Sequence, residues 1–170
     1  RAVAYGEQFD YGVYQVEEID EESTAIVGEK LVIGSALAEE VEKAAKITKM
    51  RQIGSIKGAD FSEAILSHPL RGSGFDFNVP MLPADFVTLE QGSGFVHIAP
   101  GAGSDDFELG LEHGLEVVTN VDDSGKFYDH IPLVSGMDVI KDNYQIAMIV
   151  KKAGALVAVG RLTHSYPHSW

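Results

Sequence analysis

The stretch GSGFVHIAPGAGSDD, residues 92–106, contains the strongest local pattern in the sequence. A glycine-rich turn leads into a short apolar segment, which predicts a strand over 94–99 with His97 near its C-terminal end. A proline-glycine pair ends the strand, and a serine followed by two aspartates predicts a helix over 103–114. Such a connection brings His97 and Asp106 near one loop, where ligand sites commonly lie.

The same frame occurs once before, in GSGFDFNVP, residues 72–80. Both copies read Gly-Ser-Gly-Phe-x-x-x-x-Pro, and their first glycines, Gly72 and Gly92, stand 20 residues apart. The similarity stops at each proline, which disfavours a duplicated fold. We therefore interpret the first copy as a scaffold turn and the second as the turn before a pocket strand, because only the second leads to a histidine and an acidic pair.

The composition describes an ordinary globular domain that cannot offer a broad basic surface. The chain has 170 residues, 45% of them hydrophobic, and we expect residues 1–170 to form one domain. With no cysteine, disulfides and thiolate chemistry are excluded, and a reducing compartment, the cytoplasm, is expected. A net charge of −13 leaves few cations for nucleic-acid phosphates, so most of the affinity for such a partner would have to come from elsewhere. The start at Arg1, with no initiator methionine, suggests a domain cut from a larger protein.

Short strands dominate the predicted secondary structure. Strands are predicted over 2–5, 11–18, 53–58, 85–89, 115–121 and 155–162, with a hairpin over 24–34 around Gly28. Further helices are predicted over 35–48, 59–66 and 142–154, and loop with a short edge strand over 67–92 and loop over 163–170. Regular β–α–β alternation is missing, so we expect a mainly β fold, a twisted barrel or curved mixed sheet with peripheral helices, or α+β if the helices are counted.

The residues around Asp106 suit a cationic ligand better than a phosphate or a covalent intermediate. The N-terminus of a helix keeps a carboxylate ionised, and an ionised carboxylate binds an ammonium group such as that of an amino acid. GAGSDD lacks the lysine of a phosphate-binding loop, and no Gly-x-Ser-x-Gly motif occurs. The alternative is that His97 is a core residue and that Asp105 and Asp106 only cap a helix. Metal binding by His164 and His168 is disfavoured, because a proline between them favours a loop.

Residues 92–106 resemble the Gly-Thr-Gly-x-Val-His-x-Ala-Pro-Gly-x-Gly-x-x-Asp signature of the isoleucyl-tRNA synthetase editing domain, the CP1 insertion of a class I aminoacyl-tRNA synthetase. Further segments resemble the family in the same order: RAVAY (1–5), HPL (68–70), VPMLPADFVTLEQG (79–92) and HSYPHSW (164–170). The valyl relative usually has lysine at the position of His97, and the leucyl relative has Met-x-x-Pro-Gly-His-Asp in this region. Ser93 replaces the usual threonine, and Ala102 stands where many bacterial members have histidine.

The resemblance implies post-transfer editing, the hydrolysis of Val-tRNA(Ile) made in error, with pre-transfer editing as a second route. It implies that Asp106 and His97 are the catalytic residues, Asp106 holding the substrate's ammonium and His97 positioning the terminal adenosine or the attacking water. Residues that line the substrate are then expected to be Gly94, Phe95, Val96, Ile98, Ala99, Pro100, Gly101 and Gly103. A threonine-rich strand lines this pocket in the family and is not part of the sequence, so the pocket of this chain alone is expected to be incomplete.

The expected partners also follow from the resemblance. They are the aminoacylated 3′ end of tRNA(Ile), its valine as substrate, and the rest of the synthetase in cis, in a monomeric protein without a membrane contact. No metal or cofactor is expected for editing, whereas ATP and Mg²⁺ would belong to the catalytic domain of the parent enzyme. Valyl-type or leucyl-type editing, or a non-catalytic module that docks the tRNA 3′ end, remain as alternatives.

Overall fold

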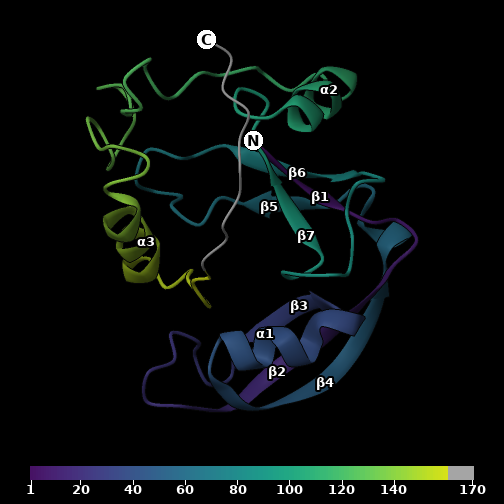
Figure 1. Ribbon diagram of the computed structural model, residues 1–170. Coiled ribbons are helices and arrows are strands. Elements are labelled where there is room, and N and C mark those ends of the chain that lie inside the picture. Colours follow the sequence, from purple (N-terminus) through teal and green to yellow (C-terminus); the bar gives the residue numbers. More distant parts are fainter. Residues whose placement is uncertain (161–170) are drawn as a thin grey trace.

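The computed structural model describes residues 1–160 and consists mainly of strands in two sheets (Figure 1). The strands are β1 (Ala2–Tyr5), β2 (Asp10–Ile19), β3 (Lys30–Gly34), β4 (Ile47–Lys57), β5 (Ile65–Ser67), β6 (Asn78–Pro83) and β7 (Phe95–Ile98). The helices are α1 (Ala38–Ala44), α2 (Ser104–Glu112) and α3 (Asn143–Lys152), with short 3₁₀ helices η1 (Ser35–Leu37) and η2 (Gly58–Phe61). The expectation of a mainly β fold with peripheral helices is confirmed.

The three-stranded sheet, in the order β3-β2-β4, forms the lower half of the molecule in Figure 1. β2 pairs antiparallel with both neighbours, and α1 lies against this sheet. The contact between them is apolar: Tyr14, Ile33, Leu37 and Ala38 are all buried in one cluster. Burial of these side chains, rather than helix propensity, is what stabilises a helix as short as α1.

The four-stranded sheet, in the order β5-β6-β1-β7, includes β7, which lies within the stretch GSGFVHIAPGAGSDD. Its central strand β1 runs parallel to β6 and antiparallel to β7. On one face, Ala2 and Ala4 are fully buried with Ile98 and with Leu109 of α2. On the other face, Tyr5 packs in a second cluster that includes Tyr11 of β2. The central strand is therefore covered on both sides, by α2 and by the other sheet.

The two Gly-Ser-Gly-Phe turns both contain two glycines in the left-handed region. Gly72 and Gly74 have φ angles of 85° and 97°, and Gly92 and Gly94 have φ angles of 79° and 83°. The first turn precedes β6 and the second precedes β7, the two strands that flank β1. In the left-handed region only glycine avoids a steric penalty, so the repeated frame is a turn device used twice on the two sides of one strand.

The two glycines of the second turn give a matched pair of predictions. Gly92→Ala places a methyl group in open space and should cost only the left-handed backbone strain, about 1–2 kcal/mol. Gly94→Ala adds a Cβ that lies 3.1 Å from the Cα of Gly34, so it should cost more than Gly92→Ala. Denaturant unfolding of both variants measures the difference, and equal losses would show that the contact between the two sheets at Gly34 is unimportant.

Three predicted strands are absent from the structure. Residues 85–89 form a turn, in which the amide of Val87 donates to the carbonyl of Ala84 at 3.3 Å and the Val87 side chain fills the core. Residues 115–121 contain a single bridge, from Val121 to Phe127, and residues 155–160 are irregular. β-rich composition produces a strand only where a neighbouring backbone is free to pair with it.

The structure also shifts several predicted boundaries. The helix predicted over 35–48 ends at Ala44, because Lys46 reverses the chain with φ +53° and β4 starts at Ile47. The segment predicted as a strand over 53–58 is thus the end of a longer strand. The helix predicted over 59–66 is wrong: η2 and β5 share this segment. The hairpin predicted over 24–34 is also wrong, because only β3 is a strand there and it pairs with β2.

The short edge strand predicted within 67–92 is wrong in its place, because the long strand there, β6, lies inside the sheet between β5 and β1. Five other predicted elements are confirmed. Strands 2–5, 11–18 and 94–99 correspond to β1, β2 and β7, and helices 103–114 and 142–154 correspond to α2 and α3. Gly114 and Gly154 follow the two helices with φ angles of 65° and 71°, as helix-ending glycines do. His164, His168 and the segment 161–170 lie outside the described residues.

Candidate functional site at the end of strand β7

Strand β7 points its side chains to two different faces of the sheet. Phe95 packs beside Tyr11 and Phe61 between the two sheets, with its ring stacked on that of Tyr11 at 4.6 Å. His97 lies on this same face, since side chains alternate along a strand, and it is paired with Val3 of β1. Ile98 lies on the opposite face, fully buried under α2, and Val96 shares that face but stays exposed.

Asp106 connects the end of β7 to the first turn of α2. Its Oδ2 accepts a hydrogen bond of 2.8 Å from the amide of Ala99, seven residues earlier. The expected cap at Ser104 is wrong, because α2 begins after Gly103 and no side chain caps it. Asp106 therefore fixes the loop between β7 and α2 with one carboxylate oxygen, and no hydrogen bond or ion pair within residues 1–160 uses the other.

A cavity of about 660 Å³ lies beside this carboxylate. Of the residues that the sequence assigned to the substrate, Gly94, Phe95 and Val96 line it together with Asp106. The other lining residues, which sequence reasoning missed, are Phe86, Thr88, Gln91 and Asp105. Phe86 and Thr88 were missed because residues 85–89 were expected to pair as a strand, whereas this segment turns and lies against β7.

The other sequence-assigned residues do not line this cavity. Ile98 belongs to the core, Ala99 donates its amide to Asp106, and Pro100 is buried against Gly110. Gly101 packs so tightly that a Cβ there would lie 2.3 Å from the carbonyl oxygen of Val118. Gly103 is the residue before α2. These residues hold the loop in place, and their backbone conformation sets the position of Asp106.

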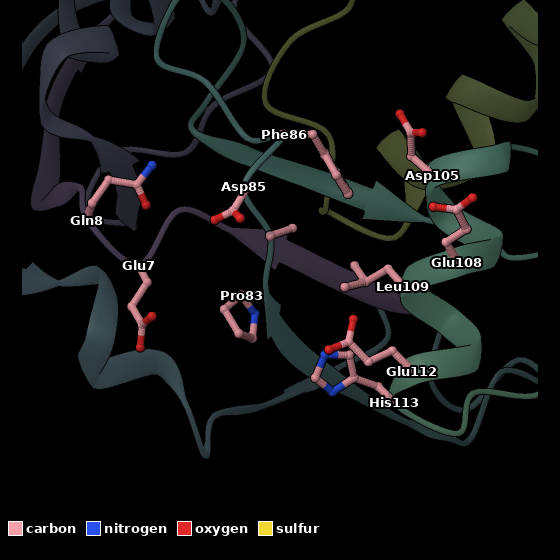
Figure 2. A pocket seen from close by; sticks show the side chains of 11 residues that line it. Glu7, Gln8, Pro83, Asp85, Phe86, Asp105, Glu108, Leu109, Glu112 and His113 are labelled. Atoms are coloured by element: carbon pink, nitrogen blue, oxygen red, sulfur yellow. The ribbon is translucent and has the colours of Figure 1, made fainter.

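A second, larger cavity of about 810 Å³ adjoins the first, since Phe86 and Asp105 line both. Figure 2 shows α2 on one side of it, with the segments that follow β1 and β6 on the other. Its acidic lining residues are Glu7, Asp85, Asp105, Glu108 and Glu112. The carboxylates make the approach to Asp106 attractive for a cation and unfavourable for a phosphate.

His97 lies near Asp106 but on the other face of β7. No hydrogen bond joins the two side chains among the bonds of residues 1–160. Partial removal of the His97 ring from water lowers its pKa, whereas the negative charge of Asp106 opposes this shift. The ring is therefore neutral near pH 7 and can accept as well as donate a hydrogen bond.

The lowered pKa of His97 predicts a defined pH dependence of stability. As the pH falls below about 6.5, the unfolded chain takes up a proton at His97 while the folded chain does not, so the free energy of unfolding falls. A His97→Gln variant should lose part of this decrease. Denaturant unfolding at about pH 7.5 and about pH 5.5 measures it, and an unchanged decrease in the variant would contradict the lowered pKa.

Within residues 1–160, no group of three or more histidine and acidic side chains is arranged to hold a metal ion. None of the helices in this part of the chain combines the length and apolar character needed to cross a bilayer.

Comparison with known proteins places this arrangement among relatives. No family model matches the chain. Curated relatives named isoleucine–tRNA ligase cover all of it: that of Pelagibacter ubique is 41% identical over 170 residues, that of Caulobacter vibrioides 38% over 188, and that of Yersinia enterocolitica 37% over 171. The chain spans 18%, 19% and 17% of these three proteins, less than a fifth of their length.

A solved structure shares the fold. It is described as the crystal structure of GlLeuRS-CP1, and it aligns with a TM-score of 0.66 over 98% of this chain and 78% of its own. The two sequences are 13% identical, so this likeness concerns the fold alone.

Proposed function

Because this chain belongs to the isoleucine–tRNA ligase family and has the fold of a CP1 editing domain, we propose that it hydrolyses the ester bond of valine mischarged onto tRNA(Ile). The physical need for such a reaction is clear. A pocket built to bind isoleucine cannot strongly exclude valine, which is one methylene smaller, and a second site that admits only the smaller product removes the error.

The observation that carries this proposal is the position of Asp106. One carboxylate oxygen is held by the Ala99 amide, so the side chain has one orientation, and the other remains available beside a cavity. An ammonium group is the natural partner of such a carboxylate. The acidic lining of the adjoining cavity would favour the same charge. Both the mischarged ester and its competitor carry this ammonium, so Asp106 would orient the aminoacyl group without discriminating.

Discrimination would then come from the apolar part of the cavity. Val96 is exposed to it and Phe86 also lines it, whereas the Phe95 ring packs on the other face of β7. These side chains would contact the substrate's aliphatic group and exclude the longer isoleucine side chain by its size. The threonine-rich strand expected from the family resemblance would complete the wall.

Hydrolysis would proceed by direct attack of water on the ester carbonyl. The new C–O bond would form with water, the bond to the ribose oxygen would break, and the proton of water would pass to the ribose oxygen. Among residues 1–160, no serine is hydrogen-bonded to a histidine in a way that would make it a nucleophile. The neutral ring of His97 would orient the ribose or the water from the other face of β7.

The test is deacylation by the full-length synthetase that contains this chain. Val-tRNA and Ile-tRNA, both on the isoleucine tRNA, are incubated with the enzyme, and the remaining aminoacyl ester is measured over time. We expect rapid loss of valine and retention of isoleucine. If both esters persist, the chain is not an editing site, and a docking module for the tRNA 3′ end becomes the better description. Threonine on valine tRNA and methionine on leucine tRNA test the valyl-type and leucyl-type alternatives.

A further inference from the structure

A second group of residues gathers beside His97, on the same face of the four-stranded sheet. Val3 of β1 is paired with His97 on one side and with Met81 of β6 on the other, so these side chains share a face. Val79, which alternates with Met81, is paired with Leu66 of β5 and shares this face. His68 follows β5 directly and Phe77 directly precedes β6, at the adjoining ends of these two paired strands.

The rings in this group form what we call the aromatic shelf, consisting of His68, Phe75 and Phe77. The His68 and Phe75 rings are stacked, with centroids 4.8 Å apart and planes inclined by 10°. Phe77 lies 5.1 Å from His68, and the Arg1 guanidinium covers Phe77 at 4.9 Å. All three rings remain partly exposed. A pair of parallel, partly exposed rings is a platform on which another flat ring can stack.

His68 is held as a neutral ring. Its Nδ1 accepts a hydrogen bond of 3.1 Å from the amide of Leu70, which fixes the tautomer with hydrogen on Nε2. Desolvation lowers the pKa of His68, and the charge of Arg71 acts in the same direction. The ring therefore stacks as an uncharged aromatic group, and its orientation is set before any ligand arrives.

Arg71 adds a fixed positive charge to the shelf. It donates to Ser67 Oγ at 2.9 Å, to the Phe77 carbonyl at 2.8 Å and to Asn78 Oδ1 at 2.9 Å. Within residues 1–160 no carboxylate forms an ion pair with it. The nearby Asp76 accepts the Gly72 amide instead. An unneutralised guanidinium is notable on a chain with a net charge of −13.

We propose that the aromatic shelf and Arg71 bind an unpaired nucleotide at the 3′ end of the tRNA, with its base stacked on the His68–Phe75 pair and a phosphate facing Arg71. Stacking platforms combined with cations are the usual means of binding single-stranded nucleic acid. The acidic cavity lies on the α2 side of the sheet, so the two faces divide the substrate: the ammonium to Asp106 and the nucleotide to the shelf. This inference rests on the proposed function.

Stacking can be measured with 2-aminopurine, whose fluorescence is quenched when it stacks. The probe is uncharged isoleucine tRNA carrying 2-aminopurine at each of its last three positions in turn, and the protein is the full-length synthetase. We expect quenching at one position to be lost in His68→Leu and retained in His68→Phe, which keeps a flat ring. The KM for deacylation of Val-tRNA should rise about 5- to 100-fold in His68→Leu, with kcat less affected.

The matched control is a stacked pair of the same kind elsewhere. Tyr128 and His130 have rings 5.8 Å apart in a loop that contributes to neither cavity, so His130→Leu should leave quenching unchanged. Quenching that survives in His68→Leu overturns the proposal. If quenching behaves as expected while the enzyme spares Val-tRNA, the editing function fails and the nucleotide site stands.

The charge of Arg71 is tested independently through the salt dependence of tRNA binding. Arg71→Gln should reduce the slope of log affinity against log salt by about 0.7, the value for one phosphate of a single strand, and Arg71→Lys should restore it. Arg51→Gln, on the other sheet, is the control and should not change the slope. A slope that is unchanged in Arg71→Gln overturns the assignment of a phosphate to this residue.

Discussion

An Asp106→Asn variant of the full-length synthetase is expected to lose deacylation of Val-tRNA by about 100-fold or more while keeping nearly the stability of the wild type. The reason is that the two carboxylate oxygens have separate tasks. In the wild type, the Ala99 amide donates to Oδ2 of Asp106 at 2.8 Å. Asparagine retains an oxygen that can accept this hydrogen bond, so the loop stays in place. It has no charge with which to hold an ammonium group in a desolvated site.

An Asp106→Ala variant is expected to lose both properties. The Ala99 amide would have no acceptor, which should lower the free energy of unfolding by about 1–3 kcal/mol, and activity should fall as it does in Asp106→Asn. Asp105→Asn is the control, because Asp105 lines both cavities yet forms no hydrogen bond with the loop. If Asp106→Asn deacylates Val-tRNA as fast as the wild type, the carboxylate is only a structural anchor.

A Tyr11→Phe variant is expected to lose about 2–4 kcal/mol of stability, a large effect for the removal of one oxygen atom. The hydroxyl accepts a hydrogen bond from the Gly6 amide and donates one to the Gly94 carbonyl, both at 2.9 Å and both buried. Phenylalanine would leave that donor and that acceptor unpaired inside the core. Because Tyr11 belongs to β2 and Gly94 precedes β7, this hydroxyl connects the three-stranded sheet to the strand that carries His97.

Tyr5→Phe is the internal control for Tyr11→Phe. Tyr5 lies in the same cluster and is fully buried, but its hydroxyl has no hydrogen-bond partner within residues 1–160. Burial raises the pKa of Tyr5, so the hydroxyl stays protonated. Without a hydrogen-bond partner, the buried hydroxyl does not stabilise the folded state. Its removal should be neutral or stabilising by about 1 kcal/mol. Equal losses in the two variants, measured by denaturant unfolding, would show that the bridge to Gly94 contributes nothing.

The sequence was sufficient for every element whose signal is local. The ends of α2 and α3 were predicted because the glycine that follows each helix ends it through a left-handed backbone conformation, which acts within a few residues. No side chain caps the start of either helix. The repeated Gly-Ser-Gly-Phe frame was predicted to form tight turns for the same reason. The resemblance of residues 92–106 to an editing-domain signature was equally readable, and the relatives confirm the family.

The sequence was insufficient wherever an element depends on a partner. Residues 85–89 and 115–121 have the composition of strands, yet no neighbouring backbone within residues 1–160 completes them as strands. Thr88 and Gln91 reach the cavity only because the first of these segments turns back toward β7. The local spacing of these residues does not indicate this contact. Hydrophobic periodicity reports on helices and strands, and the contact with β7 is a tertiary one.

The same distinction separates what determined the site. The sequence by itself determined that His97 and Asp106 stand near one strand end, since a strand, a tight loop and a helix leave little freedom between them. Only the tertiary structure decided that they lie on different faces of β7, and that Asp106 but not His97 lines the cavity beside α2. The physical reason is that the sequence shows only that side chains alternate between two faces of a strand. Which face is which is decided when β7 pairs in register with β1 and when α2 and the second sheet cover opposite faces.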